Sequence, residues 1–404
     1  MKKETRRLFG ALLMILLSLF LVIACAPSEA IPTGEKVVRI GAIPCLTGGG
    51  GTADQPNFRA FQDYVKYFNE QKGIPGVTVE LVWRDNQTNI AAFISAYRTL
   101  IDRGIPIMFS NYPTPLEGLK AQLEKDHVPF VTGGATGPLI APPGWIFAVW
   151  GSQGEAATVL LDYFMENWNK ERAPRLQLFV LDEAYGRRPA EEIAPWAEDK
   201  GFEVLPLEVC PHVVIDATTQ LVRIKERQAD LVYIQTIISG GGPIMRDVER
   251  LGLQNEMQFA GTEWICGDRL IGFSPHGTEG FLSPKALPWF DNTEIPGVRT
   301  LVEKEREYHG EVLRVPELLS GWVYAAIVCE AARKAVENVG VENVDGIAMK
   351  NALESMQDFD VDGIVKITFG PGDRRGNTSL AVYRIENGKI VRITDYREAH
   401  ILVS

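Results

Sequence analysis

The stretch Val37–Thr52, VVRIGAIPCLTGGGGT, decides the expected fold. It begins with alternating and β-branched residues, a pattern that predicts a buried strand. It ends in four consecutive glycines, Gly48–Gly51, which allow the backbone to approach another group closely. A helical pattern follows, with apolar residues at Phe58, Phe61, Val65 and Phe68. In an open parallel sheet, the loop between such a strand and helix lies at the carboxyl end of the strand, where ligands bind.

The rest of the chain repeats this strand–loop–helix unit. Strands are expected at 77–83, 105–109 and 128–131, with helices at 90–103 and 116–125 between them. The pattern restarts near Trp150, and further strands are expected at 176–181, 202–207, 230–235 and 258–260. Strands that alternate with helices predict a parallel sheet with helices on both faces. The fold class is therefore α/β, with two doubly wound parallel-sheet lobes whose strand ends can face each other.

The pattern of the later chain indicates that it crosses back from one lobe to the other. Long amphipathic helices are expected at 298–309 and 319–339, and a third helix at 346–356. Strands are expected at 364–369 and 380–385, and the turn Glu386–Gly388 predicts a hairpin with 390–393.

The first residues predict export from the cytoplasm. A basic start, with Lys2, Lys3, Arg6 and Arg7, precedes an uncharged apolar run at 8–24, and Val22–Cys25 looks like a lipobox. We expect a signal peptide at 1–24, lipid on Cys25 and a linker at 25–35, so the protein is held at a membrane surface. The alternative is a transmembrane anchor, but the run is at the short end of the spanning range.

Composition excludes several classes of function. The formal net charge of −11 disfavours nucleic acid and anionic lipid as partners. Cys45, Cys210, Cys266 and Cys329 have no CxxC spacing, so no metal site is expected, whereas a Cys210–Cys266 disulfide stays open.

Enzymatic activity is not expected. Gly48, Gly50 and Ala53 formally fit a dinucleotide fingerprint, but Pro44 and Pro56 interrupt it, and no cofactor is predicted. The five histidines are scattered and none lies beside a plausible nucleophile.

Several motifs in order resemble the type I periplasmic solute-binding proteins of ABC importers, the branch that contains the leucine/isoleucine/valine-binding protein. They are the first strand and loop at 40–48, the helix end at 68–76, the Tyr-Gly turn at 182–186, and the helix and strand at 216–224 and 230–233. The resemblance covers nearly all of the chain after the linker.

The resemblance implies a monomeric Venus-flytrap protein with three hinge crossovers. One lobe would comprise 36–150 and 279–373, and the other 151–278 and 374–404. The ligand would be a small polar solute, most simply a branched-chain amino acid, passed to the permease of an ABC importer. Short amides or urea, aromatic acids and a ligand-sensing role in a receptor stay open, as do the permease and the resting state of the lobes.

The resemblance also implies which residues hold the ligand. Gly134, Ala135 and Thr136 would bind a carboxylate beside the loop Asn111, Tyr112, Pro113 and Thr114, in which relatives have serines. Tyr185 and Glu263 would close over the ligand from the second lobe, with Glu263 facing its ammonium group.

The residue chemistry agrees with this assignment. Backbone N–H groups and hydroxyls at helix N-termini suit a carboxylate, and the predicted set also includes Thr52 in the first loop and Thr236 and Ser239 in the loop after 230–235. Glu263 could instead be a solvated loop acid, and the Tyr185 ring could simply pack against its turn.

Overall fold

The computed structural model describes residues 36–403. The predicted signal peptide and the predicted lipid site at Cys25 lie outside the described residues. Within those residues, no helix combines the length and the apolar character that spanning a membrane needs.

The first lobe is built on a six-stranded sheet in the order β14-β5-β4-β3-β1-β2. Its strands are β1 (Lys36–Ala42), β2 (Val77–Trp83), β3 (Met108–Phe109), β4 (Phe130–Thr132), β5 (Ile146–Trp150) and β14 (Arg375–Asn377). The pairs β1–β3, β3–β4, β4–β5 and β5–β14 are all parallel. The predicted parallel sheet is therefore confirmed for this lobe.

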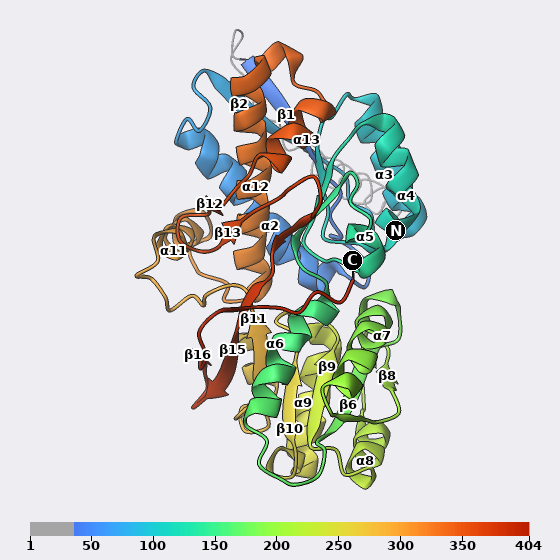
Figure 1. Ribbon diagram of the computed structural model, residues 1–404. Coiled ribbons are helices and arrows are strands. Elements are labelled where there is room, and N and C mark those ends of the chain that lie inside the picture. The colour runs from blue at the N-terminus through green and yellow to red at the C-terminus, as the bar shows by residue number, and fades with distance from the viewer. Residues whose placement is uncertain (1–35, 404) are drawn as a thin grey trace, which may run out of the picture. The chain divides into compact units, whose positions relative to one another are not determined.

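Helices from both ends of the chain accompany this sheet (Figure 1). From the early chain come α2 (Gly51–Glu70), α3 (Ile90–Asp102), α4 (Thr114–Asp126) and the short α5 (Gly137–Ile140). From the late chain come α11 (Pro296–His309), α12 (Pro316–Val339) and α13 (Gly346–Glu354), with a small hairpin of β12 (Phe359–Asp360) and β13 (Lys366–Ile367). In Figure 1 the orange α12 runs beside the blue α2, so the predicted return of the chain is confirmed.

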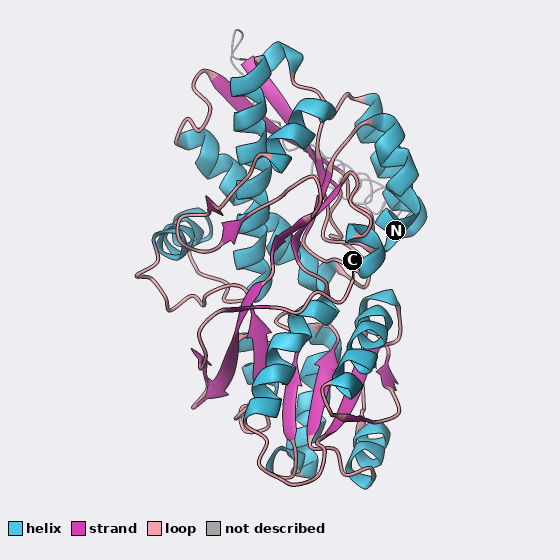
Figure 2. Ribbon diagram, viewed as in Figure 1, coloured by secondary structure: helices cyan, strands magenta, loops and turns pink. Residues whose placement is uncertain are grey.

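The second lobe is built on a nine-stranded sheet, drawn in magenta in the lower half of Figure 2. Its strands are β6 (Arg175–Leu181), β7 (Glu203–Val204), β8 (Glu208–Cys210), β9 (Leu231–Gln235), β10 (Gln258–Gly261), β11 (Leu282–Lys285), β15 (Ser379–Glu386), β16 (Lys389–Arg392) and β17 (Arg397–Glu398). Its helices are α6 (Gln153–Glu166), α7 (Ala184–Asp199), α8 (Thr218–Glu226), α9 (Ile238–Leu251) and α10 (Asp268–Phe273). Strands β6 to β11 pair in parallel, and β15 and β16 form the predicted antiparallel hairpin.

The chain crosses between the sheets three times, after β5, after β11 and between β14 and β15. Two expected lobe boundaries are therefore wrong by a few residues. Strand β11 pairs with β10, so 282–285 belong to the second sheet, and β14 pairs with β5, so 375–377 belong to the first. A strand of only three or four residues, such as β14 or β11, carries no sequence signal that says which sheet it joins, and only the observed pairing decides this.

Close packing of α12 on α2 holds the first lobe together, and it requires a glycine. A Cβ atom built on Gly321 would lie 2.0 Å from the backbone oxygen of Asn57. Because Asn57 is fully buried and its side chain is bonded to Ser320, this contact has no room to relax.

Replacing Gly321 with alanine is expected to push the two helices apart and lower the free energy of unfolding by about 1–3 kcal/mol or more. The matched control is Gly118→Ala in α4, where an added Cβ meets nothing within 4 Å. That change is expected to stabilise the helix by up to about 1 kcal/mol. Denaturant unfolding of both variants checks the pair, and equal effects would contradict the packing argument.

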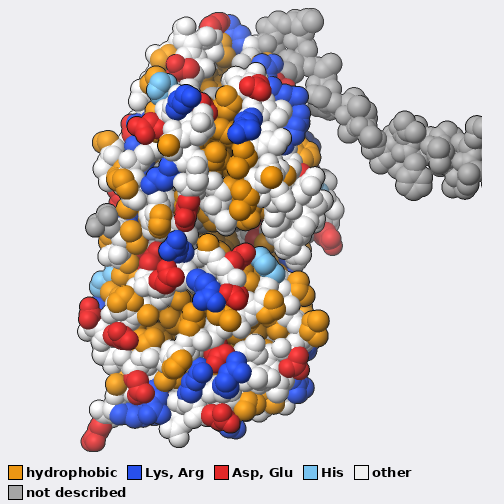
Figure 3. Space-filling view, turned by 90° about the vertical axis from the view of Figure 1, so that its right-hand side faces the viewer, with side chains coloured by type: hydrophobic (Ala, Val, Ile, Leu, Met, Phe, Trp, Pro, Cys, Tyr) orange, Lys and Arg blue, Asp and Glu red, His pale blue; other side chains and the backbone are white. Residues whose placement is uncertain are grey.

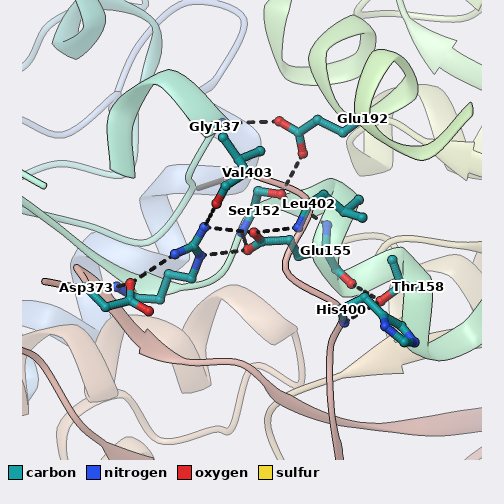
Figure 4. A network of polar contacts seen from close by, with 10 residues as sticks. Gly137, Ser152, Glu155, Thr158, Glu192, Asp373, His400, Leu402 and Val403 are labelled. Carbon is teal, nitrogen blue, oxygen red and sulfur yellow. Dashed lines mark hydrogen bonds and ion pairs between the residues drawn. The ribbon is translucent and has the colours of Figure 1, made fainter. Parts of the chain in front are cut away.

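A buried polar network lies where the chain passes between the lobes (Figure 4). Arg375 of β14 donates from Nη2 to Glu155 Oε1 at 2.9 Å and from Nε to Glu155 Oε2 at 3.0 Å. Glu155 also forms a capping box with Ser152 at the start of α6. Leu402 N–H donates to Glu155 at 3.2 Å, and the Val403 carbonyl accepts from Arg375. Residues 402 and 403 are therefore bound to the same arginine–glutamate pair.

Candidate functional site

A cavity of about 110 Å³ lies between the two lobes. It is lined by residues that follow strands of both sheets, and the strands end at the cavity: β1, β3 and β4 from one lobe, and β6, β9 and β10 from the other. The lining comprises Cys45, Gly50, Ala53, Asp54, Thr88, Asn111, Tyr112, Pro113, Thr114, Gly134, Leu181, Glu183, Tyr185, His212, Ile237, Trp264 and Glu317. The surface in Figure 3 is hollowed where the lobes meet. This position, outside the carboxyl ends of parallel strands, is where open α/β sheets bind ligands.

Much of the cavity wall is apolar. Leu181, Ile237 and Trp264 come from the second lobe, and the rings of Tyr112 and Pro113 come from the first. Trp264 is only 9% exposed, so its indole is a fixed wall. Such walls suit an apolar side chain of a small ligand.

Three long helices begin at the cavity. Gly50 is the N-cap of α2, Pro113 the N-cap of α4 and Glu183 the N-cap of α7. Helix N-termini present backbone N–H groups and a partial positive charge, which favours a bound carboxylate. The Gly50 N–H is already used, since it donates to Thr88 Oγ1 at 3.0 Å.

Two buried acids lie on helices that line the cavity. Asp54 Oδ2 accepts the Cys45 N–H at 2.6 Å, whereas Oδ1 has no hydrogen-bond partner in residues 36–403. Burial raises the pKa of Asp54 to about 7, and burial likewise raises the pKa of Glu317 to about 7. Burial also raises the pKa of the Cys45 thiol, to about 12, with a further contribution from Asp54, so this thiol stays protonated.

The second lobe contributes a histidine–glutamate pair. His212 Nε2 lies 2.9 Å from Glu183 Oε1, and His212 Nδ1 is buried without a partner among the described residues. The buried Tyr185 hydroxyl also makes no hydrogen bond within the described chain, although Thr262 and Gln235 are near it. Burial raises the pKa of Tyr185, so its hydroxyl stays protonated and can donate to a ligand.

Half of the residues predicted from the sequence line the cavity. They are Asn111, Tyr112, Pro113, Thr114, Gly134 and Tyr185. These six residues lie in the loops and helix starts that follow β3, β4 and β6.

Three predicted residues of the first lobe lie outside the lining. Thr136 donates to Glu117 Oε1 at 2.8 Å, and Ala135 pairs with Ser152 in an isolated bridge. Thr52 is exposed, and its carbonyl accepts from Arg269 of the second lobe at 3.2 Å.

Three predicted residues of the second lobe also lie outside it. Glu263, the acid expected at the ligand ammonium, instead accepts the Ala286 N–H at 3.2 Å through Oε2, beside Lys285. Ser239 donates to the His212 carbonyl at 2.7 Å. Thr236 packs under α9, where a Cβ added at Gly240 would touch its Oγ1 at 2.7 Å.

Sequence reasoning missed the acids Asp54 and Glu317 and the pair Glu183–His212. Glu183 lies in the Tyr-Gly turn at 182–186, so this motif already points to the region of Glu183. Asp54 follows the glycine run by three residues, which places it in the first turn of α2. Glu317 opens a long apolar helix, and no sequence signal separates it from an ordinary helix-start acid.

The described cysteines form no disulfide, and the possible metal ligands lie outside the cavity lining. All four described cysteines are free and buried, so Cys210 and Cys266 are not paired. In residues 36–403, the group with metal-ligand geometry is Asp63, Glu305 and His309, whose ligand atoms lie within 4.8 Å of one another. His309 Nε2 lies 2.8 Å from Asp63 Oδ2 and Arg59 donates to Glu305, so both acids already have a partner within the protein.

Two sheet lobes, three crossovers and a cavity at facing strand ends define a two-lobed solute-binding protein. The model of the periplasmic binding protein family matches residues 37–389, and the chain belongs to this family. It is a periplasmic binding protein of ABC transporter systems, and this family is extracytoplasmic.

Several solved structures share this fold. A branched chain amino acid ABC transporter protein from Thermus thermophilus with bound valine is 25% identical, with a TM-score of 0.84 over 91% of this chain and 98% of that chain. A fatty acid ABC transporter substrate-binding protein from Thermomonospora curvata is 18% identical, with a TM-score of 0.79 over 91% and 94%. A possible leucine/isoleucine/valine-binding protein from Rhodopirellula baltica is 15% identical, with a TM-score of 0.75 over 91% and 98%. No curated protein matches the sequence.

Proposed function

We propose that this protein binds an amino acid with a small branched side chain in the interlobe cavity and delivers it to an ABC importer. The observation that carries the proposal is the joint presence of apolar walls, helix N-termini and buried carboxylates around about 110 Å³. An amino acid needs all three features, since it combines an apolar side chain, a carboxylate and an ammonium group. The relative that was solved with bound valine agrees with this choice.

Delivery rests on movement of the lobes about the three crossovers. Ligand binding would favour the state in which both lobes contact it, and the permease would recognise that state. Contacts such as Arg269–Thr52 and Glu192–Gly137, both 3.2 Å, join the lobes in this structure. A lipid on Cys25 would keep the protein at the membrane that holds the permease.

A ligand with a carboxylate and no ammonium fits less well. It would leave the Asp54 carboxyl group without a partner and add a second negative charge beside it. Neutral amides or urea would leave the same acids without a counter-charge. We therefore propose amino acids as the ligands, in preference to fatty acids, aromatic acids and amides.

A panel of ligands tests the proposal. L-Valine, L-leucine and L-isoleucine are expected to raise the melting temperature by several degrees at concentrations far above Kd. L-Phenylalanine, isobutyramide, urea and 4-methylpentanoate are expected to change it little. Isothermal titration calorimetry gives the affinities, and a response to the amide or the acid without one to the amino acids would reject the proposal.

A further inference from the structure

Asp54, the acid in the first turn of α2, lies in an environment that favours binding of a positively charged group. The Asp54 side chain is 5% exposed, its Oδ2 is held by the Cys45 N–H, and its Oδ1 is unpartnered and buried in the cavity wall. A buried carboxylate with an unpartnered oxygen is costly to the folded protein. We expect such a group where a bound ligand supplies the missing hydrogen-bond partner.

A second acid reaches the same cavity from α12. Glu317 is 4% exposed and lines the cavity with Asp54. The Asn57 side chain of α2 donates to the Glu317 carbonyl at 3.3 Å and to Ser320 Oγ at 3.1 Å, so the two helices hold both acids at fixed positions. The nearness of Asp54 also disfavours ionisation of Glu317.

The protein supplies no direct counter-charge to these acids within residues 36–403. None of the residues that line the cavity there is lysine or arginine. Arg269 and Lys285 act on Glu317 only through space, and neither lines the cavity. The cation is therefore expected to come with the ligand.

We infer that Asp54 and Glu317, both in the first lobe, form the site that binds the ammonium group of the ligand. The inference rests on the proposed function and deepens it. An ammonium group has three N–H donors and a full positive charge. It can therefore donate a hydrogen bond to Asp54 Oδ1 and also interact with Glu317. Glu263 of the second lobe then has a structural role, through the Ala286 N–H and Lys285.

Isosteric variants test the assignment. Asp54→Asn and Glu317→Gln keep size and hydrogen bonding and remove the charge. Each is expected to weaken L-leucine binding at least about 30-fold in calorimetry, as for removal of one partner of a buried charged pair. Glu263→Gln is the rival assignment, and Asp199→Asn, at the exposed end of α7, is the matched surface control. Both of these are expected to stay within about threefold of the wild type.

A ligand series separates this inference from the proposed function. Isoamylamine lacks the carboxylate of leucine, and 4-methylpentanoate lacks its ammonium group. The amine is expected to bind the wild type weakly and to lose that binding in Asp54→Asn and Glu317→Gln. The acid is expected not to bind the wild type.

Each outcome decides one point. Leucine binding that survives in Asp54→Asn and Glu317→Gln but fails in Glu263→Gln overturns the ammonium site and leaves the proposed function standing. A wild type that binds isoamylamine but no amino acid rejects the proposed function, and loss of amine binding in both variants then supports the site. A wild type that binds neither the amine nor any amino acid overturns both. Thermal melting confirms that each variant is folded.

Discussion

Replacing Arg375 with methionine is expected to lower the free energy of unfolding by about 3–5 kcal/mol. The Arg375 side chain is 7% exposed and the Glu155 side chain is fully buried, and the pair is bidentate at 2.9 and 3.0 Å. Methionine keeps much of the volume but leaves the Glu155 charge buried without its cation. Because Arg375 lies on a first-lobe strand and Glu155 on a second-lobe helix, the loss also loosens a crossover (Figure 4).

Urea or guanidinium unfolding measures this effect. The matched control is Arg39→Met, which removes an arginine from the exposed pair with Glu80, where the side chains are 55% and 32% exposed. Exposed pairs contribute about 0–1 kcal/mol, so this variant is expected to unfold much like the wild type. The double variant Arg375→Met/Glu155→Gln is expected to recover part of the loss, since no buried charge is left alone. Equal losses in Arg375→Met and Arg39→Met would show that the buried pair has no special role.

The sequence was informative about the fold because each half repeats a strong local pattern. The stretch at 37–52 correctly predicted a strand, a glycine loop and a helix, and the same reasoning found β2, β6 and β9 within a residue or two. The prediction that Ser239 lies in a loop is wrong, because Ser239 and the glycines at 240–242 lie inside α9. Close packing explains the glycines: a Cβ at Gly242 would lie 2.4 Å from the Phe273 ring, and one at Gly241 would lie 3.1 Å from Ile265. The glycines at 240–242 are therefore explained by tertiary packing and not by their helix propensity, which is low.

The candidate site was predictable in part, for a related physical reason. Loop residues after strands, such as Asn111 and Gly134, follow from topology alone because strand ends meet at one edge. The two acids do not follow from it, since each sits within a helix whose other residues read as core or surface. Glu263 has the expected loop position and charge, but its side chain accepts the Ala286 N–H and does not line the cavity. Which acid faces a cavity depends on side-chain direction, and a single sequence does not encode that locally.

Removing both cavity acids is expected to make the ligand-free protein more stable at neutral and alkaline pH. The pKa values of Asp54 and Glu317 are each raised to about 7 by burial, from ordinary values near 4. Between about pH 4 and pH 7 the folded state therefore holds more protons at these acids than the unfolded chain does. Their contribution to stability falls as pH rises through that window, by about 3–4 kcal/mol for each acid, and stays low above it.

The variant Asp54→Asn/Glu317→Gln lacks this penalty, so its advantage over the wild type is expected to be small at pH 4 and largest at pH 8. Burial sets most of the effect and neighbouring charges modify it: Asp85 opposes ionisation of Asp54, whereas Arg269 and Lys285 favour ionisation of Glu317. Urea unfolding of both proteins across this pH range measures the difference. An advantage that is the same at every pH would mean that the two carboxyl groups do not titrate in this window. If the ammonium assignment is right, saturating leucine should narrow the gap at pH 8, because the ligand's charge replaces the missing partner in the wild type and finds none in the variant.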